Sequence, residues 1–252
     1  MGFDFDVQAL LTPPDVMKCK RVLCVQPHPD DNEIGMGGIV SVLVKNGCDV
    51  RYLTVTNGDR GNNDKSATVE ETAAARREET QAAGRYLGVR DFYFLDHGDG
   101  TLSDVVGLSK EIAAVIRRVK PEAVFCPDPW LNYESHLDHV VTGLAVSNAL
   151  MMTKLTLLEL PGGHEPWQVD AVGYYFTANP NTVIDITGEF ETKFAAVRLH
   201  KSQIDAQTLA LYRVYFTMKG EELAQGRGFK LGEGLKVLGK LHTHCFVDAY
   251  KL

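Results

Sequence analysis

Two short segments of the sequence contain most of the side chains that could do chemistry. His28–Asp31 reads His-Pro-Asp-Asp and comes two residues after the apolar run Val22–Val25, and His136–His139 reads His-Leu-Asp-His. The adjacent carboxylates of the first segment repel each other unless a cation lies between them. Imidazole and carboxylate groups are also ligands of catalytic zinc, which keeps one position open for water. The two segments therefore predict a divalent-metal site.

The spacing of these residues predicts a division of roles. His28 and Asp31 are three residues apart in one tight turn and can point the same way, and His139 completes a His/Asp/His ligand set. Asp30 then remains beside a ligand, where it can act as the general base toward a water that the metal activates. His136 is assigned to stabilise the developing oxyanion or to protonate a leaving amine. This arrangement predicts metal-assisted hydrolysis of an amide-like bond.

Each segment taken alone also has a purely structural interpretation. His28–Asp31 could be a polar turn that caps a helix, and Ser135 with Asp138 could form a capping box that leaves the two flanking histidines exposed. The metal interpretation is favoured because both segments follow strand-like runs. The carboxyl ends of parallel strands share one edge of a sheet, where ligands collect.

The elements that must position these residues follow an alternating pattern. Apolar, β-branched-rich runs predict strands at Arg21–Pro27, Val50–Thr56, Phe92–Asp96 and Ala123–Pro127, and longer periodic runs predict helices at Gly38–Asn46, Ala67–Leu87, Leu108–Val119 and Leu137–Met151. Such alternation indicates an α/β fold with a Rossmann-like, mostly parallel sheet that has helices on both faces. Polar segments at 57–61, 96–100 and 128–139 also follow predicted strands, so they are expected at the same rim.

The pattern changes beyond about residue 160. The sequence predicts strands at Ala171–Thr177 and Thr182–Thr187, a helix at Glu189–His200, a loop at Lys219–Leu231 and a last strand at Leu241–Tyr250. His242 and His244 would face the same side of that last strand. We interpret residues 1–252 as one domain, with a core at about 20–155 and a β-containing C-terminal elaboration at about 156–252.

Composition narrows the classes of partner. The chain has 252 residues, a net charge of -7, 44% hydrophobic and 23% charged residues, which argues against nucleic acid or an anionic membrane as a partner. The acidic segment Met1–Asp6 lacks the features of a signal peptide. The five cysteines are scattered and never spaced as CxxC, so neither disulfides nor a thiolate metal site is expected. A reducing, cytoplasmic location fits this composition.

The chain resembles the LmbE/PIG-L family of zinc-dependent N-deacetylases over nearly its whole length. The motifs that carry the resemblance occur in order at Pro27–Asp31, Gly35–Gly38, Arg76–Glu79, Asp99–Leu102, His136–His139 and His200–Gln203. Ala123–His136, Val183–Thr187 and Gly232–Gly234 are similar to the diacetylchitobiose deacetylase branch. The resemblance implies one Zn2+ per subunit, a small amino-sugar substrate, and a homo-oligomer that is a trimer or a hexamer. The implied substrate is N,N'-diacetylchitobiose or N-acetylglucosamine.

The resemblance implies the same metal ligands, general base and acid partner that the spacing predicts. It adds Asp138 as the residue that orients His136 or His139. It also implies that Arg76 and Asp99 contact the sugar and that His244 reaches the site of a neighbouring subunit. Two further candidate substrate contacts are Tyr133, which could stabilise the tetrahedral intermediate, and Trp130, which could stack on a sugar.

Simpler interpretations of these residues stay open. Arg76 could form an exposed i,i+3 pair with Glu79, Asp99 could be an ordinary turn residue, and Tyr133 could be a core or rim tyrosine. Iron or manganese would also suit a His/His/Asp set.

Two other functions are compatible with the same residues. The first is a deacetylase of a different N-acetylated substrate, such as N-acetylglucosaminyl malate, a thiol-glycoside precursor, or an antibiotic amino-sugar intermediate. The second is a catalytically silent sugar-binding module. A nucleotide-binding module is disfavoured because the loop at His28–Asp31 has acids in place of a glycine-rich phosphate cradle.

Overall fold

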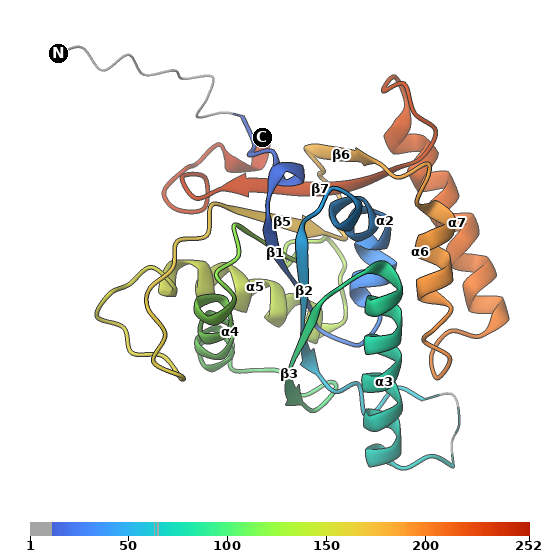
Figure 1. The fold of residues 1–252 in the computed structure, drawn as a ribbon, viewed down its shortest axis with the longest axis horizontal. Coiled ribbons are helices and arrows are strands. Elements are labelled where there is room, and N and C mark those ends of the chain that lie inside the picture. Colours follow the sequence, from blue (N-terminus) through green and yellow to red (C-terminus); the bar gives the residue numbers. More distant parts are fainter. Residues whose placement is uncertain (1–11, 63, 65) are drawn as a thin grey trace.

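The computed structural model describes residues 12–252 apart from residues 63 and 65, so the predicted absence of a signal peptide at 1–6 lies outside the described residues. Seven strands form one sheet in the order β3-β2-β1-β4-β5-β7-β6 (Figure 1). They are β1 (Arg21–Gln26), β2 (Asp49–Thr56), β3 (Asp91–His97), β4 (Ala123–Pro127), β5 (Ala171–Tyr175), β6 (Thr182–Asp185) and β7 (Gly232–Gly239). The pairings among β1 to β5 are parallel, and β7 runs antiparallel to both β5 and β6. This topology confirms the predicted α/β fold.

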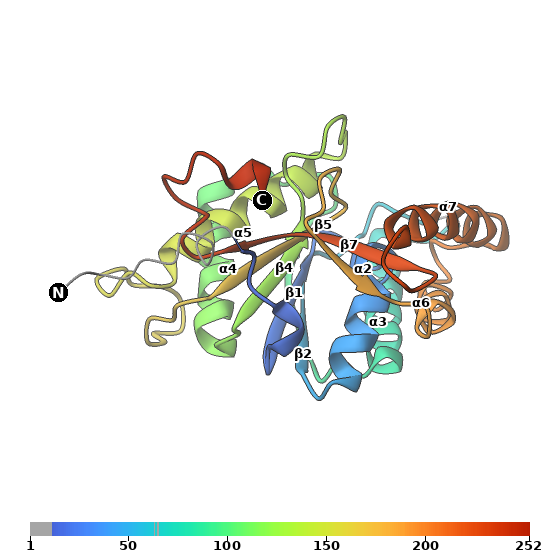
Figure 2. The same ribbon diagram turned by 90° about the horizontal axis from the view of Figure 1, so that it is seen from above.

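Helices cover both faces of the sheet. They are α2 (Asp31–Lys45), α3 (Val69–Leu87), α4 (Val105–Val119), α5 (Leu137–Met152), α6 (Phe190–Val197) and α7 (Ala206–Ala224). Figure 2 shows α4 and α5 on one side of the sheet and α2, α3, α6 and α7 on the other. Alternate residues of a strand point to opposite faces, and accordingly Val22 and Cys24 join one buried cluster while Leu23 and Val25 join the other. Within the described residues, no helix has the length and hydropathy needed to cross a bilayer.

Helix α7 is the element that the sequence pattern did not predict. Its last turns occupy the start of Lys219–Leu231, so the prediction of a loop there is wrong as far as residue 224. Leu211, Val214 and Met218 are all more than half exposed on α7. Because apolar side chains lie on its exposed face as well as its packed face, the helix has no clear amphipathic period for the sequence to reveal.

The final strand also differs from the prediction. It is β7 at Gly232–Gly239, whereas Leu241–Tyr250 forms turns that lead into the short 3-10 helix η2 (Ala249–Lys251). The glycines of β7 are typical of loops, but they are required by close packing, since a Cβ on Gly232 would lie 2.7 Å from the Val183 side chain. His242 accepts a hydrogen bond from the backbone N–H of Gly239 through Nδ1, so this pair of histidines does not lie on a strand.

The glycine-rich part of α2 contains a kink that a buried ion pair supports. The helix begins at Asp31 rather than at the predicted Gly38, and Met36 is non-helical with φ of −149°. The kink frees the backbone N–H of Ile39, which donates to Glu233 at 2.7 Å. Glu233 is in turn 2.5 Å from Nζ of Lys193, whose side chain is only 1% exposed. The C-terminal elaboration is therefore anchored on the helix that begins at the polar rim.

Replacing Lys193 with Met is expected to lower the free energy of unfolding by about 3 to 5 kcal/mol, because it leaves the Glu233 carboxylate buried without a cation. Adding Glu233→Gln should recover part of the loss, since the amide oxygen still accepts from Ile39. Urea unfolding checks both. Lys240→Met is the control, because its ion pair with Asp170 is half exposed and should contribute less than about 1 kcal/mol. Equal losses in the two lysine variants would contradict the anchoring role of Lys193.

Candidate functional site

The first polar segment forms the turn between β1 and α2 at the carboxyl edge of the sheet. The backbone N–H of His28 donates to the Asp31 carboxylate at 2.8 Å, and the N–H of Asn32 donates to the Gln26 side chain at 3.0 Å. Asp30 has φ of 115°, a left-handed conformation that side chains other than glycine rarely adopt. The turn thus uses side-chain hydrogen bonds and a strained residue to place Asp30 and Asp31 side by side.

The structure brings the three predicted metal ligands together. The Asp31 carboxylate lies between two imidazoles, with Oδ2 3.3 Å from Nδ1 of His28 and Oδ1 3.3 Å from Nε2 of His139. The potential ligand atoms of this set all lie within 4.8 Å of one another. All three side chains are largely buried, and Asp31 is in the first turn of α2, where the helix dipole favours a negative charge.

A second set around His28 also has ligand-like spacing: His28, Asp99, His136 and Asp138. In this set, however, Asp138 is already used by the protein, because its carboxylate accepts from the backbone N–H of Gly100 at 2.7 Å and of Leu102 at 3.2 Å. It also lies 3.2 Å from Nε2 of His28. A carboxylate on the outer nitrogen of a metal-ligating histidine is the usual second contact of such sites.

The negative charge of the carboxylates around His28 favours a bound cation. Burial lowers the pKa of His28, but hydrogen bonds with Asp138, Asp31 and Asp99 outweigh it and raise the pKa to about 11. The surrounding carboxylates therefore favour positive charge at this point. A divalent ion held by His28, Asp31 and His139 would supply such a charge, and Nε2 of His28 faces Asp138. The donor set and its outer contact thus fit zinc at His28, Asp31 and His139.

Asp138 lies against a different histidine from the one predicted. The sequence assigned it to orient His136 or His139, but its side-chain hydrogen bond is with His28. The alternative capping box of Ser135 and Asp138 does not form either, since α5 begins with His136 as its N-cap residue and no side chain caps it.

Asp30 and Arg76 form a buried pair beside the ligand set. Oδ2 of Asp30 lies 3.4 Å from Nη2 of Arg76, which also donates to the carbonyl of Pro29 at 2.8 Å, and Nη1 of Arg76 donates to the carbonyl of Gly58 at 3.0 Å. Arg76 is 4% exposed and holds this turn in place, so it is not the exposed partner of Glu79. Burial and the neighbouring Asp31 charge raise the pKa of Asp30 to about 6, which Arg76 partly opposes.

Replacing Arg76 with Met is expected to lower the free energy of unfolding by about 3 kcal/mol or more, because two carbonyls and a buried carboxylate lose their donor. Chemical denaturation measures the change. Arg77→Met is the matched control on the next residue, whose side chain is 41% exposed and pairs with the exposed Asp96. An effect of Arg76→Met no larger than that of the control would contradict the positioning role.

His136 and Asp99 complete the group around His28. His136 is 46% exposed on its side chain, its ring centroid is 4.3 Å from that of His28, and its Nε2 is 3.9 Å from Oδ1 of Asp99. Burial and the neighbouring histidines lower the pKa of His136, so its imidazole is neutral near pH 7. Oδ1 of Asp99 lies 3.2 Å from Nε2 of His28, and its Oδ2 lies 3.8 Å from Nη1 of Arg76. Asp99 is therefore part of the cluster and not only a turn residue.

The other predicted substrate contacts lie outside this cluster. Trp130 is 61% exposed and packs edge-on against Tyr174, and Tyr133 is fully exposed with a φ of 68°. His244 contacts the Cys245 thiol at 3.3 Å in an exposed turn. Within the described part of the chain, none of these three has a hydrogen bond or ion pair to the His28 cluster.

Two acidic residues of the site had no role in the sequence prediction. Glu134 accepts from the backbone N–H of His136 at 2.7 Å and lies 3.7 Å from Nδ1 of His139, so it supports the second segment. Glu33 is fully buried and contacts the fully buried His200 at 3.1 Å. The pairing of His200 with an acid in the first turn of α2 is a long-range contact that no local pattern reveals.

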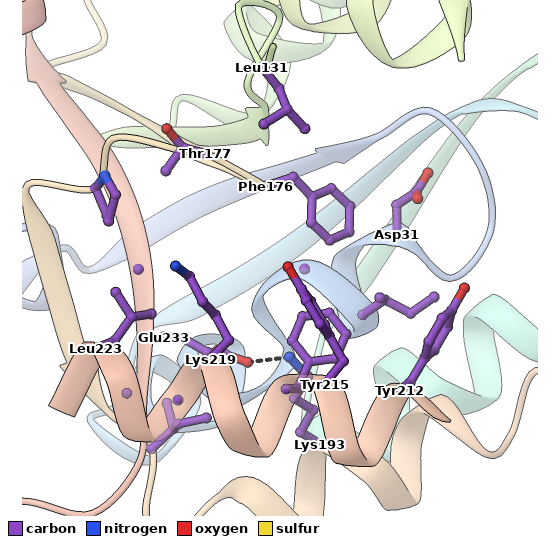
Figure 3. Close-up of a pocket in the computed structure, with 18 of the residues that line it drawn as sticks. Asp31, Leu131, Phe176, Thr177, Lys193, Tyr212, Tyr215, Lys219, Leu223 and Glu233 are labelled. Carbon is purple, nitrogen blue, oxygen red and sulfur yellow. Dashed lines mark hydrogen bonds and ion pairs between the residues drawn. The ribbon is translucent and has the colours of Figure 1, made fainter. Parts of the chain in front are cut away.

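A cavity of about 850 Å³ begins at Asp30, Asp31 and His139. Figure 3 shows its course, from Asp31 and Phe176 at one end, along α7, to Leu223 at the other. The three residues at its start give any ligand in the cavity direct access to the predicted metal and to the buried Asp30 carboxylate.

Comparisons with known proteins identify the family of the chain. The family model described as "PIG-L: GlcNAc-PI de-N-acetylase" matches residues 23–150. The diacetylchitobiose deacetylase of Thermococcus kodakarensis is 36% identical over 228 residues, which cover 89% of this chain and 85% of that protein. A Bacillus cereus protein named "Probable N-acetyl-alpha-D-glucosaminyl L-malate deacetylase 2" is 30% identical over 192 residues, covering 74% of this chain and 85% of that one. The solved N,N'-diacetylchitobiose deacetylase of Pyrococcus horikoshii superposes with a TM-score of 0.87 at 33% identity, covering 97% of this chain and 92% of that chain. The chain belongs to the PIG-L family of de-N-acetylases.

Proposed function

We propose that this protein hydrolyses the N-acetyl group of an N-acetylglucosamine-type sugar, N,N'-diacetylchitobiose or N-acetylglucosamine, with zinc held by His28, Asp31 and His139. The observation that carries the proposal is that these ligand atoms lie within 4.8 Å of one another while Asp30 is adjacent and outside the set. The substrate follows from the named activity of the Thermococcus and Pyrococcus relatives.

When bound, the zinc would lower the pKa of a water molecule and polarise the acetyl carbonyl. Asp30 accepts the proton of the attacking water, and its burial against Asp31 makes it a stronger base than an exposed carboxylate. Arg76 holds this carboxylate and the backbone of its turn in place.

His136 acts on the oxygen of the acetyl carbonyl. Its neutral imidazole donates a hydrogen bond to the acetyl oxygen that becomes negatively charged, and Asp30 passes the proton that it took from the water to the departing nitrogen. The amide C–N bond breaks, which gives acetate and a free amino sugar. Asp138 holds His28 rather than His136, whose side chain is 46% exposed at the mouth of the site.

Acetate release from a panel of substrates tests the proposal. The panel contains N-acetylglucosamine, N,N'-diacetylchitobiose and N-acetylglucosaminyl malate, each assayed with zinc and after chelation. We expect zinc-dependent release, fastest from one of the first two sugars. Preference for the malate conjugate would favour the activity named for the Bacillus relative. Sugar binding without acetate release at any metal loading would instead favour a silent binding module.

A further inference from the structure

The cavity beside the ligand set extends far beyond what an acetyl group can fill. Its wall on α7 runs from Leu211 to Leu223, which is roughly 18 Å at 1.5 Å per residue. An acetyl group contributes a single methyl carbon next to the carbonyl. Most of the cavity of about 850 Å³ is therefore available to another part of a ligand.

The lining of this groove is mainly hydrocarbon and aromatic. Its apolar side chains come from α2, α6, α7 and the loops after β4 and β5: Ile34, Leu131, Phe176, Phe190, Tyr212 and Phe216. Its charged residues outside the ligand set and Asp30 already have partners. Lys193 and Glu233 are bound to each other at 2.5 Å, Lys219 pairs with Glu222 at 3.0 Å, and Glu134 accepts from the backbone N–H of His136. A hydroxyl-rich sugar would find few free polar partners there, whereas an alkyl chain would be well accommodated.

The groove also lies on a particular side of the ligand set. It contacts Asp31 and His139, but Asp99 and His136 are not part of its lining. Those two residues lie toward Nε2 of His28, on the opposite side from the Nδ1 that faces Asp31. An amide carries its amine substituent on one side of the carbonyl carbon and its acyl chain on the other. A sugar held on the side of Asp99 and His136 therefore directs the acyl chain into the groove.

We propose that the groove along α7 is an acyl-chain site, and that the enzyme also removes straight-chain N-acyl groups longer than acetyl, up to about octanoyl, from amino sugars. This inference rests on the proposed function. The chemistry is unchanged: water adds to the acyl carbon, the C–N bond breaks, and the products are a fatty carboxylate and the free amine. Only the chain that occupies the groove differs.

A series of N-acyl glucosamines tests the proposal on the zinc-loaded enzyme. The substrates are the N-acetyl, N-butyryl, N-hexanoyl and N-octanoyl derivatives. We expect KM to fall by about threefold for each added methylene group. This factor is somewhat smaller than the one expected for a methylene that is completely buried. The turnover number should change little, because the reacting atoms are the same. A tenfold or greater fall of kcat/KM from acetyl to butyryl would overturn the proposal.

The variant Ala178→Trp should fill the groove away from the metal ligands, since Ala178 is an exposed residue that lines it. We expect it to abolish the dependence of KM on chain length and to leave hydrolysis of the N-acetyl sugar within about twofold. Ala210→Trp is the matched control, an exposed alanine of α7 that is not part of the lining. An unchanged chain-length series in Ala178→Trp would overturn the assignment.

Two other occupants give distinct results. If Ala178→Trp selectively lowers kcat/KM for the disaccharide and leaves the acyl series unchanged, the groove holds a second sugar. If it lowers the oligomeric mass without affecting either series, the groove holds a second copy of the chain. Both results overturn the acyl site. Calorimetry with octanoate and acetate tests the acyl site separately from the proposed deacetylase activity. If no sugar is hydrolysed, the proposed activity fails. Octanoate binding that Ala178→Trp abolishes would still support the acyl site. Octanoate binding no tighter than acetate would overturn it.

Discussion

Replacing Asp30 with Asn is expected to lower the turnover number for acetate release by about a thousandfold, within the range that a positioned general base contributes. The amide cannot accept the proton of the attacking water. Asparagine tolerates the left-handed backbone of this position, where φ is 115°, so the turn should be retained. Bound zinc should stay at the wild-type level because Asp30 is outside the proposed ligand set. Steady-state kinetics and elemental analysis measure the two quantities on the same sample.

Asp96→Asn is the matched control for this variant. Asp96 also has a positive φ, 58°, and it also pairs with an arginine, but it is exposed and outside the cluster. Its turnover should remain within about twofold of wild type. Turnover of Asp30→Asn close to wild type would remove Asp30 as the base, and a loss of zinc in that variant would make Asp30 a ligand.

Replacing His139 with Ala is expected to abolish zinc binding and, with it, acetate release. The residue supplies one of three proposed ligands, and the Asp31 carboxylate cannot hold the ion with His28 alone. Zinc at about 100 times its dissociation constant should raise the free energy of unfolding of the wild type by about 2.7 kcal/mol. The variant should show no such gain. Unfolding with and without zinc thus tests the site without relying on activity.

Two histidine variants serve as controls for this result. His97→Ala removes a histidine on the same rim that contacts Glu111 at 3.1 Å and is outside both ligand-like sets, so zinc binding should persist. His136→Ala should retain zinc and lose most of the activity. If His136→Ala loses the metal while His139→Ala retains it, the ion is held by the second set, around His28, Asp99 and Asp138.

Much of this site could be predicted because its central residues are close in sequence. His28, Asp30 and Asp31 share one turn, so their mutual placement depends on a few backbone angles and on the neighbouring Gln26 and Asn32 side chains. The alternation of strands and helices is also a local property, since it reflects periodicities of two and of 3.6 residues. Parallel strands then bring their carboxyl ends to one edge, which is why the His136–His139 segment could be expected next to the first one.

Local patterns in the sequence are therefore sufficient to predict the α/β fold, the motif order of the PIG-L family and the candidate His/Asp/His set. The contacts made across long stretches of chain depend instead on the folded arrangement: Arg76 is buried against Asp30, and Asp138 is hydrogen-bonded to His28 across 110 residues. The same holds for α7 and the groove beside it. The physical reason is that burial and partner choice depend on which surfaces meet after folding, and a residue's neighbours in sequence carry little information about those surfaces.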